Sequence, residues 1–300
     1  MRRFAIMTDE PGWHGDELRA AFSLRGCEAT FVSLTGCRFD IGAPHGLIIP
    51  GFEGLPDGIF VRSISAGTLE QITLRLGVLH ALQELGVPVY NDARAIERSV
   101  DKSMTSFLLK LRGIPTPSTW VCESEPAARD LVMRETAAGR ELVLKPLFGS
   151  QGKGLRRIAD IRDLASANEM NGVFYLQRFI DCGVGNWHDW RVFAIGGRAV
   201  AAMIRRGKTW INNVAQGADC EAAELTPRLR NLAEGASRAL GMDYAGIDVI
   251  HDPESGYSVI EVNSIPAWKG LQAVCSLNIA QSLADDLLAR VPPLQLMGAR

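Results

Sequence analysis

The stretch "GIDVIHDPESGYSVIEVN", from Gly246 to Asn263, joins two apolar runs through a polar turn that contains a proline and a glycine. This pattern predicts a β-hairpin. Glu261 and Asn263 stand two positions apart on the second run, so their side chains point to the same face of that strand. If the two runs pair, Asp248 on the first run meets them on that face. The hairpin therefore predicts three oxygen-bearing side chains in one place.

A cation explains such a set better than an apolar core does. Carboxylates left bare among Ile and Val cost free energy. Mg²⁺ takes one or two carboxylates in proteins and leaves its other positions to water and substrate phosphates. We therefore predict that Asp248, Glu261 and Asn263 bind a metal ion. Two alternatives stay open, because the acids can instead pair with buried arginines or lie exposed on a hairpin with two solvated faces.

A glycine-rich loop, "FGSQGKG", follows the apolar strand "LVLK" that ends at Lys145. Gly149, Gly152 and Gly154 allow backbone amides to turn toward a ligand, and converging amides favour an anion such as a phosphate. Lys145 is placed to bridge phosphate oxygens. The loop lacks the P-loop spacing, and a strand rather than the helix of a Rossmann turn is expected after it. A flexible loop without a ligand is the alternative.

A third polar set begins at "HDWRVF", where Asp189 and Arg191 again stand two apart on an expected strand. The next strand ends in the basic residues Arg205, Arg206 and Lys208. The planar fork of arginine suits phosphate and carboxylate groups. A solvated basic strand end is the alternative.

The fold class follows from the order of the apolar runs. From the start to about residue 91, short apolar runs alternate with amphipathic helical ones, which predicts an α/β unit with a mainly parallel sheet. Two prolines in "IPTPSTW" then predict an extended connection to an α+β region. Gly196 and Gly197 predict a second hairpin. Beyond residue 91 we predict helices over 93–113, 125–138, about 160–170, about 226–240 and about 277–290.

Composition limits the class of protein. A chain of 300 residues with 47% hydrophobic residues can build two or three domains with substantial cores. A net charge of -2 provides no global basic field, so we expect no nucleic-acid partner. The six cysteines lack metal-like spacing and no secretory signal is visible, which predicts free thiols in the cytoplasm. No run approaches the roughly 20 apolar residues that a bilayer requires, so we expect a soluble protein and no membrane partner.

Several motifs, taken in order, resemble one family. They are "VRSI" before a long helix, "DKSMTSFLLKLRGIPTPST", "LVLKPLFGSQGKGL", "LQRFI", "DWRVFAIGGRAVAAMIRR", "NNVAQGA", "AGIDVI" and "VIEVNSIPAWKG". From about Arg62 to Ala280 the chain resembles the ATP-grasp carboxylate–amine ligases, and within them the RimK-type glutamate ligases. The resemblance implies an α/β architecture with an N-terminal pre-ATP-grasp domain, residues 1–95, and two α+β ATP-grasp subdomains, residues 96–182 and 183–300, that clamp ATP.

The resemblance also implies roles for individual residues. Contacts to ATP are implied for Lys102, Lys145, Gly149, Ser150, Gln151, Gly152, Gly154, Gln177, Arg178, Phe179 and Asp189. Arg191 and Lys145 would act in catalysis, and Asp248, Glu261 and Asn263 would hold two Mg²⁺ or Mn²⁺ ions. The chain departs from the family at Arg178, where an acidic residue is usual, and at Ile211, where an arginine is usual. These departures put a side-chain contact to the nucleotide and the acid-substrate site in doubt.

The activity implied is phosphorylation of a carboxylate to an acylphosphate by ATP, followed by attack of an amine. The segments "WINNVAQGA" and "NSIPAWKGLQ" look most like relatives that add L-glutamate to tetrahydromethanopterin-type small acids. A bulky pterin would give Trp210 and Trp268 a reason to lie near the mouth of the site. Core packing is the alternative for these two tryptophans and for Trp187 and Trp190. Other functions left open are ligation to a protein or peptide C-terminus, phosphorylation of a small molecule, and ATP binding without turnover. The sequence does not decide between a monomer and a homo-oligomer.

Overall fold

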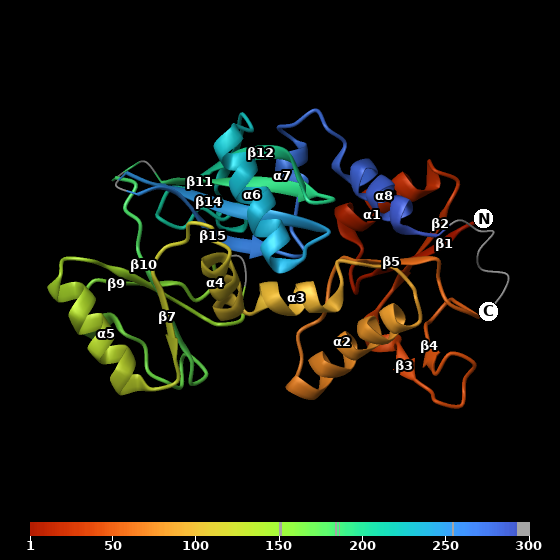
Figure 1. Ribbon diagram of the computed structural model, residues 1–300, viewed down its shortest axis with the longest axis horizontal. Helices are drawn as coiled ribbons and strands as arrows, with labels where there is room; N and C mark the ends of the chain where they lie inside the picture. Colours follow the sequence, from red (N-terminus) through yellow and green to blue (C-terminus); the bar gives the residue numbers. More distant parts are fainter. Residues whose placement is uncertain (150–151, 184, 186, 254, 293–300) are drawn as a thin grey trace.

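The computed structural model describes residues 1–149, 152–183, 185, 187–253 and 255–292. Its described strands form three sheets of four or five strands and one short two-stranded ribbon. In Figure 1 a middle antiparallel sheet lies at the left, the N-terminal sheet lies at the right, and a five-stranded sheet lies above and between them. No helix in the described ranges combines the length and the apolar character that crossing a membrane requires.

The N-terminal sheet is parallel, as predicted, with strand order β2-β1-β5-β6. Its strands are β1 (Arg3–Met7), β2 (Glu28–Val32), β5 (Gly58–Val61) and β6 (Val89–Tyr90). The helices over its two faces are α1 (Gly12–Ser23) and α8 (Ile279–Arg290) on one side and α2 (Leu69–Glu84) on the other. Successive side chains of β1 point to opposite faces of the sheet, which explains why both faces are covered. Phe4 and Ile6 join the core under α1 and α8, and Ala5 and Met7 join the core under α2. The ribbon of β3 (Arg38–Phe39) and β4 (Leu47–Ile48) stands beside this sheet.

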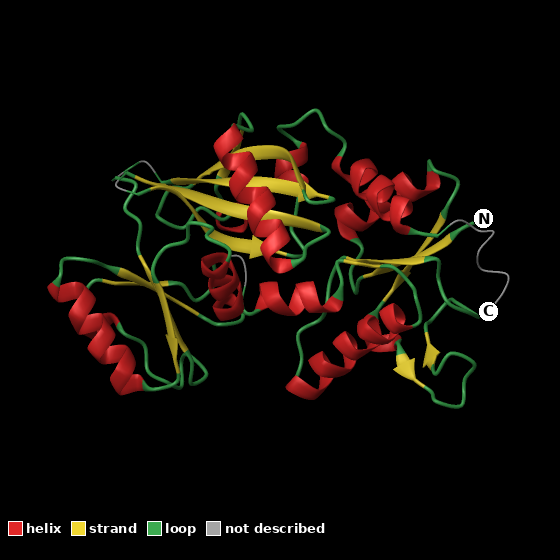
Figure 2. Cartoon of the chain, in the orientation of Figure 1, coloured by secondary structure: helices red, strands yellow, loops and turns green. Residues whose placement is uncertain are grey.

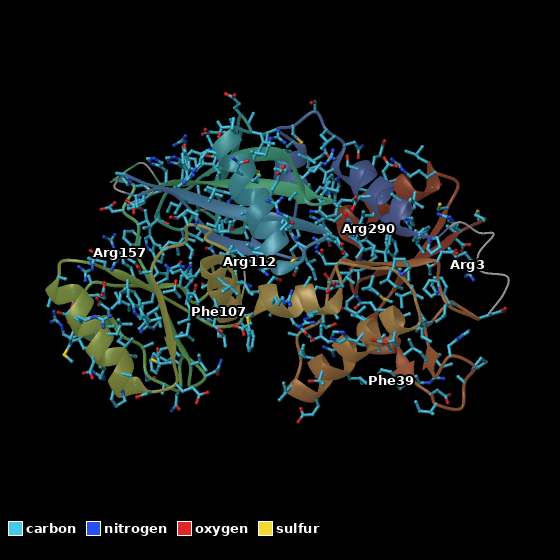
Figure 3. The ribbon with its side chains drawn as sticks, viewed as in Figure 1. Arg3, Phe39, Phe107, Arg112, Arg157 and Arg290 are labelled. Carbon is cyan, nitrogen blue, oxygen red and sulfur yellow. The ribbon has the colours of Figure 1, made fainter. Side chains whose placement is uncertain are left out.

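The C-terminal helix α8 belongs to the N-terminal core although it lies far away in the sequence. Tyr90 Oη donates to Asp286 at 2.8 Å, and the labelled Arg290 in Figure 3 bonds Asp286 at 2.9 Å and also pairs with Asp243. Sequence patterns do not show that two distant helices share one sheet face. The domain limits given above stay a prediction.

The stretch expected as one helix over 93–113 is two helices, so that prediction is wrong. The two helices are α3 (Ala93–Val100) and α4 (Lys102–Leu111). Asp101 separates them with an extended backbone, and its carboxylate accepts hydrogen bonds from the N–H groups of Ser103 at 2.8 Å and Met104 at 3.1 Å. The side chain that caps the second helix therefore ends the first one.

The middle sheet is antiparallel with strand order β7-β10-β8-β9. Its strands are β7 (Thr119–Cys122), β8 (Leu142–Lys145), β9 (Arg156–Ile158) and β10 (Phe174–Arg178), and α5 (Glu125–Ala137) packs on it. Figure 2 shows that α5 lies on one side of this sheet, whereas helices lie on both sides of the N-terminal sheet. The other face of the middle sheet is therefore left for the cleft described below.

The helix expected over about 160–170 is absent from the described residues, and only a 3₁₀ turn, η2 (Ile161–Asp163), forms there. The carboxylate of Asp163 turns back to accept hydrogen bonds from the N–H groups of Asp160 at 2.8 Å and Ala159 at 3.0 Å. Leu164 then leaves the turn in an extended conformation. Local side-chain bonds compete with the helix here, which explains why that prediction is wrong.

The five-stranded sheet is antiparallel with order β13-β12-β11-β14-β15. Its strands are β11 (His188–Ile195), β12 (Arg198–Arg206), β13 (Asp219–Ala222), β14 (Tyr244–Asp252) and β15 (Gly256–Asn263). The hairpin predicted at Gly196 and Gly197 joins β11 to β12. Helix α6 (Pro227–Leu240) covers one face, and the short α7 (Lys269–Gln272) follows β15. Two further 3₁₀ turns are η1 (Leu34–Gly36) and η3 (Val214–Gln216).

Candidate active site

The β14–β15 hairpin pairs as predicted. Asp248 lies directly opposite Glu261, and Asn263 lies opposite Gly246, so the three side chains share one face. Ile247 and its neighbour Val249 belong to the core under α6, and the polar set therefore points away from that helix. A register shift after Asp248 leaves Ile260 as an extra residue in β15. Such bulges re-aim side chains next to functional sites.

Asp248 is 2% exposed and already has two arginine partners. Its Oδ2 lies 2.9 Å from Nη2 of Arg191 and 3.0 Å from Nη2 of Arg205. Arg205 also makes a bidentate pair with Asp189, with both distances at 2.7 Å. We call Asp189, Arg191, Arg205 and Asp248 the ion cluster. The alternative of pairing with buried arginines is therefore correct for Asp248.

Burial and pairing act in opposite directions on the two acids of the ion cluster. Burial favours the neutral form of Asp248, but Arg191 and Arg205 outweigh it and hold the pKa of Asp248 below its usual value. Burial is the largest influence on Asp189 and raises its pKa to about 6, despite the opposing charge of Arg205. Arg205 pairs with both acids and so links them, a role that its sequence motif did not reveal.

Glu261 differs from Asp248, although the two residues are opposite each other. Its carboxylate has no hydrogen-bond or ion-pair partner in the part of the chain that the structure describes, and it faces the charges of Lys102 and Lys145. Asn263 donates through Nδ2 to the carbonyl of Gly246 at 3.2 Å, which leaves its Oδ1 for a ligand. These two oxygens fit a hard cation.

No cluster of three His, Cys, Asp or Glu side chains in the described ranges could hold a metal ion by itself. Glu261 and Asn263 fit Mg²⁺, which needs only one or two carboxylates when phosphates supply other ligands. Asp248 can join that set through Oδ1, which pairs only with Nε of Arg191 among the described residues, whereas its Oδ2 already meets both arginines. The predicted ligand set of all three residues therefore stays a prediction.

Two lysines stand on the other side of the same space. Lys145 donates through Nζ to Oε1 of Gln177 at 2.6 Å, and Lys102 donates to the carbonyls of Leu147 at 3.3 Å and Gly149 at 2.8 Å. Burial lowers the pKa of Lys145 to about 8 and also lowers that of Lys102. Burial removes hydrating water from both ammonium groups, and an anionic ligand would compensate for the lost solvation free energy.

The glycine-rich loop lies against the segment around residues 211–213. Gly152 has a φ of +70°, and a Cβ there would stand 2.7 Å from Oδ1 of Asn213 and 2.8 Å from the side chain of Ile211. At Gly154 a Cβ would stand 2.8 Å from Pro146. Only glycine combines this backbone with this contact. Ser150 and Gln151, also expected to contact ATP, lie outside the described residues.

Strand β10 ends with the three residues expected near an adenine. Gln177 is buried, and the side chain of Arg178 turns toward α5, where Nη2 bonds Glu135 at 3.0 Å. The N–H groups of Arg178 and Phe179 donate to the carbonyls of Ser118 at 2.8 Å and Glu141 at 2.9 Å. Any hydrogen bond between the backbone of these two residues and a base would therefore be accepted by their carbonyl groups.

Aromatic rings gather beside this hinge. The ring of Phe179 lies 6.3 Å from that of Trp187 and 5.9 Å from that of Trp210, and the labelled Arg157 in Figure 3 lies 4.2 Å over it. Trp268, in contrast, is completely buried in the core shared with α8. The placement of Trp268 at the mouth of the site is therefore wrong, and only core packing describes it.

Two hollows meet at the polar face of the five-stranded sheet. The inter-sheet cleft separates that sheet from the middle one, and its lining includes Lys102, Lys145, Gly149, Gly152, Gln177, Arg178, Phe179, Asp189, Asp248 and Glu261. The wide cavity, with a volume of about 1120 Å³, opens toward the N-terminal sheet, and its lining includes Arg62, Arg191, Asn263 and Lys269. Lys102, Gly149, Arg205, Asn213 and Glu261 line both. The sequence analysis named Arg205 in a basic strand end and Arg62 in a family motif, but no pattern predicted that Arg205 lines both hollows or that Arg62 lines the wide cavity.

A family model described as "RimK-like ATP-grasp domain" matches residues 99–287. The chain belongs to this family. The tetrahydromethanopterin:alpha-L-glutamate ligase of Methanococcus maripaludis is 36% identical over 237 residues, which cover 76% of this chain and 78% of that protein. A probable alpha-L-glutamate ligase of Legionella pneumophila (strain Corby) is 29% identical over 97% of both chains.

A solved structure has the same fold. The ATP-grasp ligase PsnB, complexed with minimal precursor, Mg and ADP, superposes with a TM-score of 0.71 and 20% identity over 96% of this chain and 98% of that one. The predicted ATP-grasp fold is confirmed. The chain is an ATP-dependent carboxylate–amine ligase, and ATP-grasp ligases use ATP and Mg²⁺. The number of ions and the roles of individual residues stay predictions.

Proposed function

We propose that this ATP-grasp ligase joins the amino group of L-glutamate to a carboxylate of a small acid, such as a tetrahydromethanopterin-type cofactor. The similarity to ligases named for that reaction supports the choice of substrates. The volume of the wide cavity, about 1120 Å³, exceeds that of ordinary small-molecule pockets and supports simultaneous binding of an amino acid and an acceptor.

The observation that carries this proposal is the position of Glu261 where the two hollows meet. Its carboxylate has no partner among the described residues, it lines both hollows, and two poorly hydrated lysines face it. ATP would lie in the inter-sheet cleft with its phosphates near Lys102 and Lys145. Glu261 and Asn263 would hold Mg²⁺, which neutralises phosphate charge when it is bound. Two ions, with Asp248 as a further ligand, are part of the proposal.

The chemistry needs no nucleophilic side chain. A carboxylate oxygen of the acceptor attacks the γ-phosphorus of ATP, and ADP leaves. The amine of glutamate then attacks the acyl carbon, the phosphate leaves with that oxygen, and the amine loses a proton as the amide forms. Arg191 would stabilise the transferred phosphoryl group and the oxyanion, because its guanidinium is fixed by Asp248 at the edge of the wide cavity. The glycine-rich loop would keep water away from the acylphosphate.

A mass-spectrometric assay tests the proposal. The purified protein is incubated with ATP, Mg²⁺, L-glutamate and a metabolite extract, and the Glu261→Gln variant serves as the control. We expect an acid that gains one glutamyl residue, and ADP release that requires both glutamate and that acid. Gain of another amino acid would keep the ligase chemistry and reject glutamate, whereas a product that retains phosphate would indicate a kinase. Nucleotide-dependent stabilisation without any product would indicate a binding module.

A further inference from the structure

Most charges around the wide cavity are compensated by the protein itself. Arg191 and Arg205 are paired within the ion cluster. Lys102 donates to two backbone carbonyls and faces Glu261. Among the acids of the lining, Glu97 bonds His80 at 3.0 Å and Asp101 caps α4. In the proposal above these groups are either paired within the protein or, like Lys102, occupied by ATP, so they leave little charge for a second substrate.

Arg62 and Lys269 are the exceptions among the described residues of the lining. Neither has a carboxylate within ion-pair distance in the described ranges. The half-buried guanidinium of Arg62 lies 5.3 Å over the ring of Trp268, and its Nη1 makes one long contact of 3.4 Å with the carbonyl of Ile265. The ammonium of Lys269 lies 5.9 Å over the ring of Trp13. Burial lowers the pKa of Arg62, as expected for a cation without an acid partner.

His14 fixes the backbone of Lys269 and of Trp268, over whose ring Arg62 lies. The imidazole of His14 accepts hydrogen bonds through Nε2 from the backbone N–H groups of Trp268 at 3.1 Å and Lys269 at 3.3 Å. The same ring meets Trp268 edge-on, with centroids 4.6 Å apart. Burial, and then the charges of Arg62 and Lys269, lower the pKa of His14 to about 4. His14 is therefore neutral near pH 7 and fixes the backbone without compensating either cation.

The wall contributed by α2 is apolar. Leu69, Ile72 and Leu76 of this helix line the same cavity, and Leu69 is largely exposed to it and to solvent. A ligand that suits both walls carries a negative group at one end and an apolar body at the other. Arginine binds a carboxylate through two parallel hydrogen bonds, and lysine adds a mobile point charge.

We propose that Arg62 and Lys269 form the binding site for a substrate carboxylate that is not phosphorylated. This inference rests on the proposed function, in which L-glutamate and the acid acceptor each bring such a carboxylate. The pair selects acidic substrates and orients them, while the phosphorylated carboxylate lies nearer Arg191 and Glu261. The family motifs quoted above assign no such role to either residue.

Steady-state kinetics of Arg62→Gln and Lys269→Gln test the site. Loss of a charge-assisted hydrogen bond is expected to raise KM about 10- to 100-fold for one carboxylate substrate, with kcat at saturation and KM for ATP nearly unchanged. Arg62→Lys should recover only part of the loss, because lysine lacks the planar fork. A rise in KM for glutamate assigns the site to the amino acid, and a rise in KM for the acid assigns it to the acceptor. Unchanged KM for both substrates in folded variants would overturn the inference.

The control is Arg19→Gln. Arg19 also places its guanidinium over an aromatic ring, 4.7 Å from the centroid of Phe31, but it pairs with Asp16 and does not line the cavity. This variant should leave both KM values unchanged.

Direct binding separates this inference from the proposed function. L-Glutamate and γ-L-glutamyl-L-glutamate serve as probes of the amino acid and of an acid acceptor, titrated calorimetrically with ADP and Mg²⁺ present. We expect Arg62→Gln to weaken at least one probe about tenfold or more relative to Arg19→Gln. That result supports the site even if the product assay rejects glutamate ligation. Equal affinities of both probes for both variants would overturn the site while leaving the ligase proposal intact.

Discussion

The ion cluster and the Arg62–Lys269 pair both present arginine to the wide cavity, and they differ in what the protein has already done with the charge. In the cluster each arginine holds a buried aspartate at 2.7 to 3.0 Å. In the pair neither cation has an acid partner among the described residues. An arginine that is already paired with an aspartate binds a further anion less favourably than an unpaired one does. The pairing, however, holds its guanidinium in one geometry. The ion cluster therefore fixes the reacting face, and the Arg62–Lys269 pair is left to recognise a substrate.

The largest effect is expected in the ion cluster. Arg205→Met leaves Asp189 and Asp248 buried with one partner fewer, which should lower the free energy of unfolding by about 3–5 kcal/mol. Urea unfolding measures this change. The neighbouring Arg206→Met is the control, because Arg206 and its partner Glu221 are both exposed and should contribute little. Equal stabilities of the two variants would show that the cluster does not hold the face together.

Glu261→Gln should reduce catalysis and spare stability. Loss of one preorganised electrostatic group at a phosphoryl-transfer site reduces kcat by about 10²–10³-fold. The melting temperature should stay close to that of the unchanged protein, because Glu261 has no protein partner among the described residues that the substitution would remove. Turnover by this variant at the original rate would exclude Glu261 from the metal site.

Lys145 predicts a pH dependence. Burial lowers its pKa to about 8, so in the free enzyme it is protonated below that pH and loses its charge as the pH rises through it. Because kcat/KM reports the free enzyme, kcat/KM for ATP should decline above about pH 8. In Lys145→Met the value should be low at every pH without that decline. The same inflection in both proteins would assign the titration to another group.

Gly152→Ala tests the closure of the glycine-rich loop. A left-handed backbone costs an L-residue about 1–2 kcal/mol, and the added methyl would also meet Asn213 and Ile211. We expect KM for ATP to rise about tenfold. Gly172→Ala is the matched control, since Gly172 has a similar φ of +79° but no atom within 4 Å of its added Cβ. Parallel behaviour of the two variants would assign the effect to backbone strain alone.

The smallest effect is expected at Arg178. Its side chain pairs with Glu135 on α5 and turns away from the inter-sheet cleft. Arg178→Gln should therefore leave KM for ATP unchanged and cause only a small loss of thermal stability. A large rise in KM for ATP would show that the guanidinium turns toward the nucleotide during the reaction.

Much of this architecture could be predicted from the sequence, because strand alternation carries over directly into three dimensions. A period of two places Glu261 and Asn263 on one face. Asp248 joins them only because the bulge at Ile260 shifts the pairing, since an unbroken ladder from the turn would place Asp248 opposite Ile260 and on the other face from Glu261. The bulge at Ile260 leaves no trace in that pattern, since an extra apolar residue resembles any other residue of a buried strand.

Arg205 shows a different limit. Two adjacent arginines are equivalent in sequence, yet Arg205 is 4% exposed and Arg206 pairs with Glu221 at the surface. Counting back from the hairpin at Gly196 and Gly197 would have placed Arg205 opposite Asp189 only after allowing for the irregularity between Phe193 and Ala194. Contacts such as those of Arg62 with Ile265 and Trp268 join residues about 200 positions apart, and no local pattern predicts them.

Transfer of oxygen from the acceptor to phosphate shows whether the reaction passes through an acylphosphate. The acceptor identified by mass spectrometry is labelled with ¹⁸O in its carboxylates and incubated with the protein, ATP, Mg²⁺ and L-glutamate. Activation as an acylphosphate predicts that one labelled oxygen appears in each phosphate released, in step with amide formation. Amide formation with unlabelled phosphate would contradict the account.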